Sequence, residues 1–177
     1  MIQISLKAEF DNALRSLAGL EKQVEVAAQQ AINRVAATAK SIAVKSISSE
    51  TGIQQKLVRD RIAIFKASRS ALSAVVSAFK YAPNLIRYQA KQTKAGVSAK
   101  AWNQRKVYRG TFIGNKGRTV FKRVGKARLP IKAVYGPSIP QTFIKARTTE
   151  AMIQAVQTRW PTEFDAALAN QLRRAGL

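Results

Sequence analysis

The 177-residue sequence contains no cysteine and no histidine. Without these residues the chain has no disulfide, no thiolate zinc site, no Ser-His-Asp triad and no imidazole metal ligand. A two-metal nuclease needs clustered carboxylates, whereas the acid pairs Glu21/Glu25 and Glu163/Asp165 are explained by surface and helix-capping roles. We therefore expect no enzyme activity, no catalytic residues, no metal site and no cofactor.

Long hydrophobic runs and addressing signals are also missing. The longest nearly uncharged apolar run, residues 71–79, has about half of the roughly 20 residues that a membrane helix needs. The first residues carry no basic leader ahead of an apolar stretch. We expect no signal peptide and no membrane span, with synthesis in a cytoplasm.

Acidic residues are scarce and unevenly placed. Lys and Arg number 31 against 9 Asp and Glu, which gives a formal net charge of +22. Residues 61–149 contain no carboxylate at all but hold 20 of the 31 basic residues. Such segregation favours a polyanionic or acidic partner, although a solvated basic surface is the alternative.

Hydrophobic periodicity predicts the elements of the first third of the chain. Alternation over residues 2–6 predicts a strand, and apolar residues at spacings of three and four predict a long helix over residues 10–47. Its many alanines permit close approach of another backbone, either a sheet of the same chain or a neighbouring subunit. Residues 51–54 resemble a capping box that opens a short helix through Arg59, and residues 62–65 and 72–79 predict an antiparallel hairpin.

The basic middle is predicted to form a β-hairpin or arm over residues 91–128. Strand signals at 107–109 and 119–121 flank a turn at 114–117. Because its apolar side chains are too sparse for a separate core, we expect this arm to become ordered against partners.

The C-terminal third predicts one more strand and then helices. The strand is expected over residues 129–135, a second capping box at 138–141, and a helix whose apolar stripe includes Phe143, Ile153, Val156 and Trp160. Pro161 is expected to interrupt this helix and restart it. The fold class is therefore α+β: a long N-terminal helix on an antiparallel sheet with a basic β-hairpin, then C-terminal helices, in a single domain over residues 1–177.

Basic residues interleaved with aromatic ones form the candidate contact site. Tyr108, Phe112 and Phe121 lie among them, a pattern typical of proteins that contact a nucleic-acid backbone. No base-reading motif accompanies it, so DNA contact should be independent of sequence; alternatively, the aromatics form a small core. The candidate DNA- or partner-contact residues are Lys106, Arg109, Lys116, Arg118, Lys122, Arg123, Lys126 and Arg128.

Several blocks of the sequence resemble one known family. Residues 31–36 (Ala-Ile-Asn-Arg-Val-Ala), 50–61 (Glu-Thr-Gly-Ile-Gln-Gln-Lys-Leu-Val-Arg-Asp-Arg), 123–132 (Arg-Val-Gly-Lys-Ala-Arg-Leu-Pro-Ile-Lys) and 139–143 (Ile-Pro-Gln-Thr-Phe) resemble the minor tail protein Z family of tailed phages and prophages. The ending, from residues 159–161 through 171–174, is similar as well. The likeness is weak between residues 65 and 119.

The resemblance implies a structural virion protein without enzymatic activity. It implies completion of the head-proximal end of a long non-contractile tail, for joining to the head and positioning of the DNA end. It also implies contact with tail terminator, tail tube and neck or head-completion proteins in a homo-oligomeric ring of about six copies, with sequence-nonspecific contact to phage DNA. The alternative from composition alone is a sequence-nonspecific nucleic-acid-binding protein of ribosomal or nucleoid type.

Overall fold

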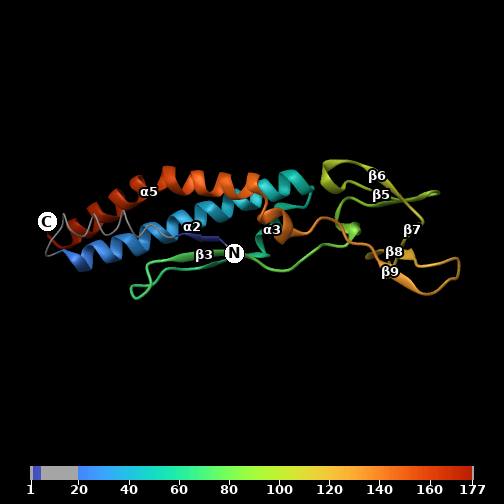
Figure 1. Cartoon of the computed structure of the whole chain (residues 1–177), viewed down its shortest axis with the longest axis horizontal. Coiled ribbons are helices and arrows are strands. Elements are labelled where there is room, and N and C mark those ends of the chain that lie inside the picture. Colours follow the sequence, from blue (N-terminus) through green and yellow to red (C-terminus); the bar gives the residue numbers. More distant parts are fainter. Residues whose placement is uncertain (1, 5–19, 177) are drawn as a thin grey trace. The chain divides into compact units, whose positions relative to one another are not determined.

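A computed structural model describes residues 2–4 and 20–176 and confirms the α+β class (Figure 1). The chain forms two compact units. Unit 1 comprises Met1–Ala43, Ile62–Ala78 and Ala146–Leu177, and unit 2 comprises Val44–Arg61 and Phe79–Lys145. The expectation of a single domain stays a prediction.

Among the residues that the structure describes, unit 1 contains two long helices. Helix α2 (Glu21–Thr51) contributes its residues up to Ala43, and α5 (Ala146–Arg174) runs beside it (Figure 1). The predicted helical residues before position 20 lie outside the described residues. Alanine allows close packing because its side chain is small, and the buried face of α2 in this unit includes Ala27, Ala28, Ala31, Ala36 and Ala39.

Helix α5 is continuous, so the predicted interruption at Pro161 is wrong. Pro161 is exposed and lies inside the helix, while Val156, Trp160 and Phe164 are buried. The Trp160 and Phe164 rings stack with centroids 5.3 Å apart. Burial of these side chains before and after the proline in the sequence offsets the free-energy cost of the backbone hydrogen bond that proline cannot donate. Ile153, predicted in the stripe, is 48% exposed instead.

Glu163 links the two helices, which corrects its predicted capping role. Because α5 does not restart at Pro161, Glu163 lies well inside a helix. Its carboxylate is 3.5 Å from Arg34 Nη1 of α2 and 3.8 Å from Arg159 Nη1 one turn earlier.

A three-stranded antiparallel sheet completes unit 1. Strands β1 (Ile2–Ile4), β2 (Ile62–Phe65) and β3 (Ala74–Ala78) are ordered β1-β3-β2, which confirms both the predicted N-terminal strand and the hairpin. Asn33 of α2 holds the loop between β2 and β3. Its Oδ1 accepts a hydrogen bond from Ala67 N (2.8 Å), and its Nδ2 donates to Ala67 O (3.2 Å).

The last part of α2 belongs to unit 2 and ends later than predicted. The helix continues through the serine-rich stretch to Thr51, and Gly52 follows at φ +77°, a conformation that glycine adopts without strain. Helix α3 (Gln55–Arg59) ends as predicted, but its capping box is wrong. The Thr51 hydroxyl instead donates to Ile47 O (2.6 Å) and accepts from Ile53 N.

Unit 2 contains two small antiparallel sheets. The first consists of β4 (Lys91–Thr93), β5 (Gly96–Ala99) and β6 (Lys106–Arg109); the second consists of β7 (Thr111–Gly114), β8 (Thr119–Arg123) and β9 (Ile131–Ala133). Both strand signals and the turn at 114–117 are confirmed, but the two strands do not pair with each other. β4, β5 and β7 were not predicted individually, and β7 is the partner of β8.

Residues 91–128 share a core with the rest of unit 2 and form no separate one, in line with their sparse apolar side chains, and the expected ordering against partners stays a prediction. Val97, Val120, Leu85, Tyr88 and Phe143 are each at most 1% exposed. Short helices η1 (Leu85–Arg87), η2 (Ala101–Asn103) and α4 (Ile139–Phe143) complete the unit.

The second predicted capping box is also wrong. Ser138 precedes α4 but makes no side-chain capping hydrogen bond.

Among the described residues, no helix is both long and apolar enough to cross a membrane.

Candidate partner and nucleic-acid interface

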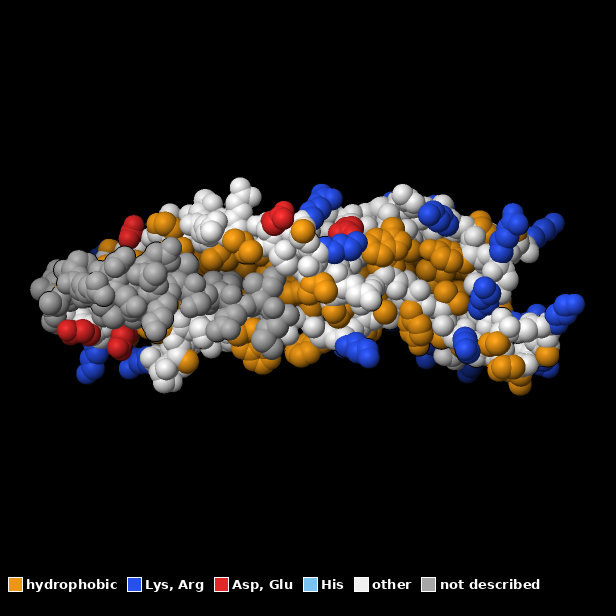
Figure 2. Space-filling model, in the orientation of Figure 1, with side chains coloured by type: hydrophobic (Ala, Val, Ile, Leu, Met, Phe, Trp, Pro, Cys, Tyr) orange, Lys and Arg blue, Asp and Glu red, His pale blue; other side chains and the backbone are white. Residues whose placement is uncertain are grey.

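Positive charge is concentrated in unit 2. Its two segments hold 20 Lys and Arg against 2 acids, a net charge of +18, whereas unit 1 holds 11 against 7, a net charge of +4. Figure 2 shows lysine and arginine side chains but no acidic ones over the part of unit 2 that carries β4 to β9. The segregation seen along the sequence is therefore a segregation between folded units.

The structure places all eight candidate residues in unit 2 with exposed side chains. Two lie on β6 and six belong to the second sheet and its connections. Lys106 and Arg109 lie on β6; Lys116 and Arg118 in the turn between β7 and β8; Lys122 and Arg123 on β8; and Lys126 and Arg128 in the loop between β8 and β9.

The register of the second sheet places two lysines directly opposite each other. Lys122 of β8 faces Lys132 of β9, and Thr111 of β7 lies on the other side of Lys122. Like charges at paired positions of an antiparallel sheet are destabilising. A fold that retains this arrangement is suited to a negatively charged partner. Lys132 was not among the predicted candidates because only the register shows its position.

The opposite face of this sheet carries two phenylalanines and an arginine. Phe112 and Phe121 are register partners whose ring centroids lie 6.0 Å apart, and both side chains are half-buried. The Arg123 guanidinium lies over the Phe112 ring, 5.4 Å from its centroid, within reach of a cation–π interaction. These aromatics support one another and their strand, so the predicted alternative of a small aromatic core describes them better than an open stacking platform.

None of the eight candidates forms an ion pair within the described part of the chain. The two acids of unit 2, Glu50 and Asp60, both precede the sheets in the sequence. Glu50 forms an ion pair with Lys145, whose ammonium group also lies 4.6 Å from the centroid of the Trp102 ring. The charge of the candidate surface is thus left for external groups.

Trp102 is an exposed aromatic residue that the sequence analysis did not select. It is 44% exposed, and both Trp102 and Asn103 have positive φ angles, 57° and 54°. Asn103 Nδ2 donates a hydrogen bond to Ser49 O at the end of α2. A fixed exposed indole beside a cation is a common feature of protein interfaces, but no local sequence pattern identifies it.

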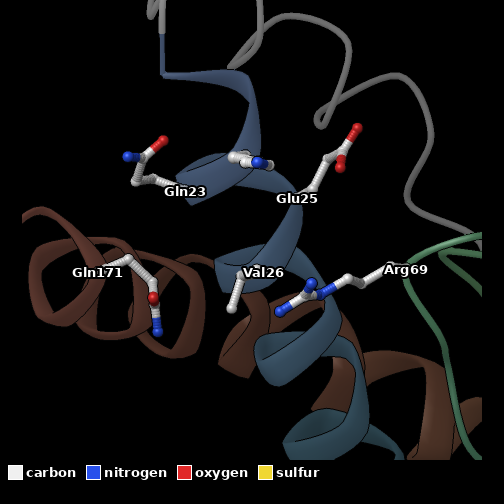
Figure 3. Close-up of a pocket in the computed structure, with 6 residues that line it drawn as sticks. Gln23, Glu25, Val26, Arg69 and Gln171 are labelled. Atoms are coloured by element: carbon white, nitrogen blue, oxygen red, sulfur yellow. The ribbon is translucent and has the colours of Figure 1, made fainter. Parts of the chain in front are cut away.

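The described residues that line a cavity of unit 1 include one acid and no histidine or cysteine. This cavity of about 270 Å³ lies between α2, α5 and the hairpin loop (Figure 3), and the buried Nε2 of Gln171 has no hydrogen-bond partner among the described residues. No group of three or more acidic side chains that could hold a metal occurs in residues 2–4 and 20–176. The cavity is lined by Lys22, Gln23, Glu25, Val26, Arg69 and Gln171.

The comparisons with known proteins give one match. The sequence model of the family described as prophage minor tail protein Z matches residues 8–176 of the 177-residue chain. No curated protein and no solved structure matches significantly. The family match covers nearly the whole chain, including both folded units.

Proposed function

The chain belongs to the prophage minor tail protein Z family and is a structural protein of phage tails, and from this premise we propose that it completes the head-proximal end of a long non-contractile tail. In this position it joins the tail to the filled head and helps to position the DNA end. It assembles as a ring of about six copies between tail terminator, tail tube and neck or head-completion proteins.

The charge of unit 2 is the observation that supports this proposal in addition to the family match. A net charge of +18 in one folded unit, with eight exposed candidate cations that form no ion pair among the described residues, favours a negatively charged partner outside the chain. A head-proximal ring offers two sources, which are the DNA in the channel and the acidic surfaces of neighbouring proteins.

The relative contribution of DNA and of neighbouring proteins follows from a comparison of their charges with the charge of the ring. Duplex DNA carries one charge per ~1.7 Å of axis, so ~40 Å of DNA supplies roughly 24 phosphates. A ring of about six copies, each with a net charge of +22, brings about 130 positive charges. DNA neutralises the smaller share, and acidic neighbours meet the larger one.

The proposal is tested in the phage or prophage that encodes the protein. Mass spectrometry of purified tails should detect the chain, and gold-labelled antibody should mark the head-proximal end in electron micrographs. Deletion of the gene should yield tails that do not join heads. Absence from tails, or labelling of the opposite end, would contradict the proposal.

The nucleic-acid-binding alternative makes a different prediction. A ribosomal or nucleoid-type protein should bind duplex DNA as a monomer or dimer, with log affinity falling by ~0.9 per phosphate neutralised against log salt. A tail component should bind DNA weakly in isolation and should remain in particles washed with salt.

A further inference from the structure

The loop between β8 and β9, residues 124–130, combines exposed aliphatic and cationic side chains. Val124 is 53% and Leu129 is 67% exposed, while Lys126 and Arg128 are exposed between them in sequence. All seven residues of the loop are exposed. Two exposed aliphatic side chains in so basic a segment are not explained by solubility or by the unit's own core.

The backbone fixes the place of these side chains within the loop. Val124 N donates a hydrogen bond to Pro130 O (3.1 Å), which closes the loop at its base. Val124 and Leu129 therefore belong to the base of the loop, next to the sheet. The tip is formed by residues 125–128, which carry both cations.

This arrangement distinguishes between two kinds of partner. A loop that wedges into DNA presents its apolar side chain at the tip, where it can enter between base steps. Backbone-reading contact uses cations and gains nothing from exposed aliphatic groups. Here the tip is cationic and the base is apolar, so the loop combines the apolar and the charged contacts that protein interfaces use together.

We propose that the β8–β9 loop docks onto another protein of the tail or neck, on an apolar patch bordered by carboxylates. Charge complementarity selects this occupant: residues 61–149 contain no acid, so Lys126 and Arg128 find no counterion nearby in sequence. A second copy of the chain is a poor match, since both of its units carry net positive charge. This inference rests on the proposed function because it places the partner in the assembled particle.

Site-specific photo-cross-linking in assembled particles tests the inference. Leu129→p-benzoylphenylalanine is introduced into the full chain in the phage, tails are purified and irradiated, and cross-linked peptides are identified by mass spectrometry. We expect a cross-link to a different tail or neck protein, at a segment that contains Asp or Glu beside apolar residues. Ile153→p-benzoylphenylalanine, at an exposed aliphatic position of α5, is the matched control and should not give that cross-link.

The contrary outcomes are distinct. Cross-links from position 129 to DNA, to a second copy, or to nothing would overturn the inference while leaving the proposed function standing. Absence of the wild-type chain from tails would overturn both.

Two double variants separate apolar from electrostatic contributions. Val124→Ser with Leu129→Ser, and Lys126→Gln with Arg128→Gln, should each lower incorporation into tails by about tenfold or more. Binding of the purified chain to a 40-base-pair duplex should fall only for the charge variant. Because every changed side chain is exposed, circular dichroism should show unchanged folding; equal incorporation of the apolar variant and wild type would overturn the inference.

Discussion

The side-chain amide of Asn84 pairs with the main chain of Val120 as a neighbouring strand would. Asn84 Oδ1 accepts from Val120 N (2.8 Å), and Nδ2 donates to Val120 O (3.2 Å). The same Oδ1 also accepts from Ile86 N (3.1 Å) at the start of η1. One side chain thus joins the second sheet of unit 2 to the segment that carries Leu85 and Tyr88 into the core.

Asn84→Asp is expected to destabilise unit 2 by about 1–3 kcal/mol. The carboxylate keeps the acceptor but replaces the donor, so a charged oxygen faces Val120 O, which then retains only its hydrogen bond from Val134 N (2.9 Å). Urea unfolding at pH 7 measures the loss. Asn115→Asp is the control, because Asn115 is exposed in a turn at φ 51° and Asp tolerates this conformation; it should change stability by less than about 0.5 kcal/mol. Equal effects at both positions would show that the added charge, not the lost donor, matters.

Tyr88 should make stability fall at alkaline pH. Its side chain is 1% exposed, and burial, followed by the neighbouring Tyr81 and Tyr108, raises the pKa of its phenol well above the ordinary value of 10.0. The unfolded chain releases this proton near pH 10 while the folded chain keeps it, so stability is constant below that pH and falls above it. Above that pH, this group lowers the free energy of unfolding by about 1.4 kcal/mol per pH unit.

Tyr88→Phe isolates this contribution. The variant loses the hydrogen bond from the hydroxyl to Pro137 O (3.3 Å) at every pH, about 1 kcal/mol, but it should lack the additional alkaline fall. Urea unfolding of both proteins between pH 8 and 11 provides the comparison. Parallel pH profiles would contradict the prediction.

Gly96→Ala should prevent normal packing of the first sheet of unit 2. Gly96 has φ +146°, and an added Cβ would lie 2.2 Å from the backbone oxygen of Tyr108 on the paired strand. Strand β6 would have to move, so we expect a loss well above the ~1 kcal/mol of an unfavourable backbone angle alone. Gly110→Ala is the control, since Gly110 has φ +70° but open space around its Cβ. Thermal unfolding should rank the two variants clearly, and similar melting temperatures would refute the steric argument.

Local pattern predicted most elements of the fold, because alternation and helical spacing depend only on neighbouring residues. It failed where contacts beyond the local pattern determine whether a helix continues or how its end is capped. Pro161 is retained inside α5 because Trp160 and Phe164 pack on either side of it in the sequence. Thr51 looked like a helix cap, but its hydroxyl is engaged with Ile47 and Ile53.

The candidate surface was predictable in composition but not in arrangement. The eight cations and their exposure follow from an acid-free segment. The opposition of Lys122 and Lys132 depends on the register of β8 with β9, and β7 was missed because its pairing depends on contacts outside its own four residues. The exposure of Leu129 likewise depends on the closed loop: the predicted strand began at Leu129, where a leucine is normally a core residue, but β9 begins only at Ile131.

Lys122→Glu should stabilise the second sheet of unit 2. The new carboxylate would face Lys132 across the strands, which replaces repulsion by attraction worth about 0.2–1 kcal/mol. The gain should shrink in 0.5 M salt because both groups are exposed. Lys126→Glu makes the same charge change in the loop without a cross-strand partner, so it is the control. Equal gains for both variants would attribute the effect to net charge alone.

Neutralising the cations of β8 and its preceding turn should weaken DNA contact without unfolding the chain. The combined variant Lys116→Gln, Arg118→Gln, Lys122→Gln and Arg123→Gln removes four exposed charges that have no internal ion pair. If all four contact phosphates, the slope of log affinity for duplex DNA against log salt should fall by about 3–4. The melting temperature should stay the same or rise, since like-charge repulsion is relieved.

A matched variant in unit 1 distinguishes direct DNA contact at β8 from an effect of the net charge of the whole molecule. Lys66→Gln, Arg147→Gln, Arg173→Gln and Arg174→Gln lower the net charge by the same amount at four exposed positions. Because the slope counts the phosphates that are neutralised, this variant should leave it nearly unchanged if DNA contacts the second sheet of unit 2 and not these four side chains. Equal slopes for the two variants would mean that DNA responds to total charge, and the surface of β8 would then have no special part in positioning the DNA end.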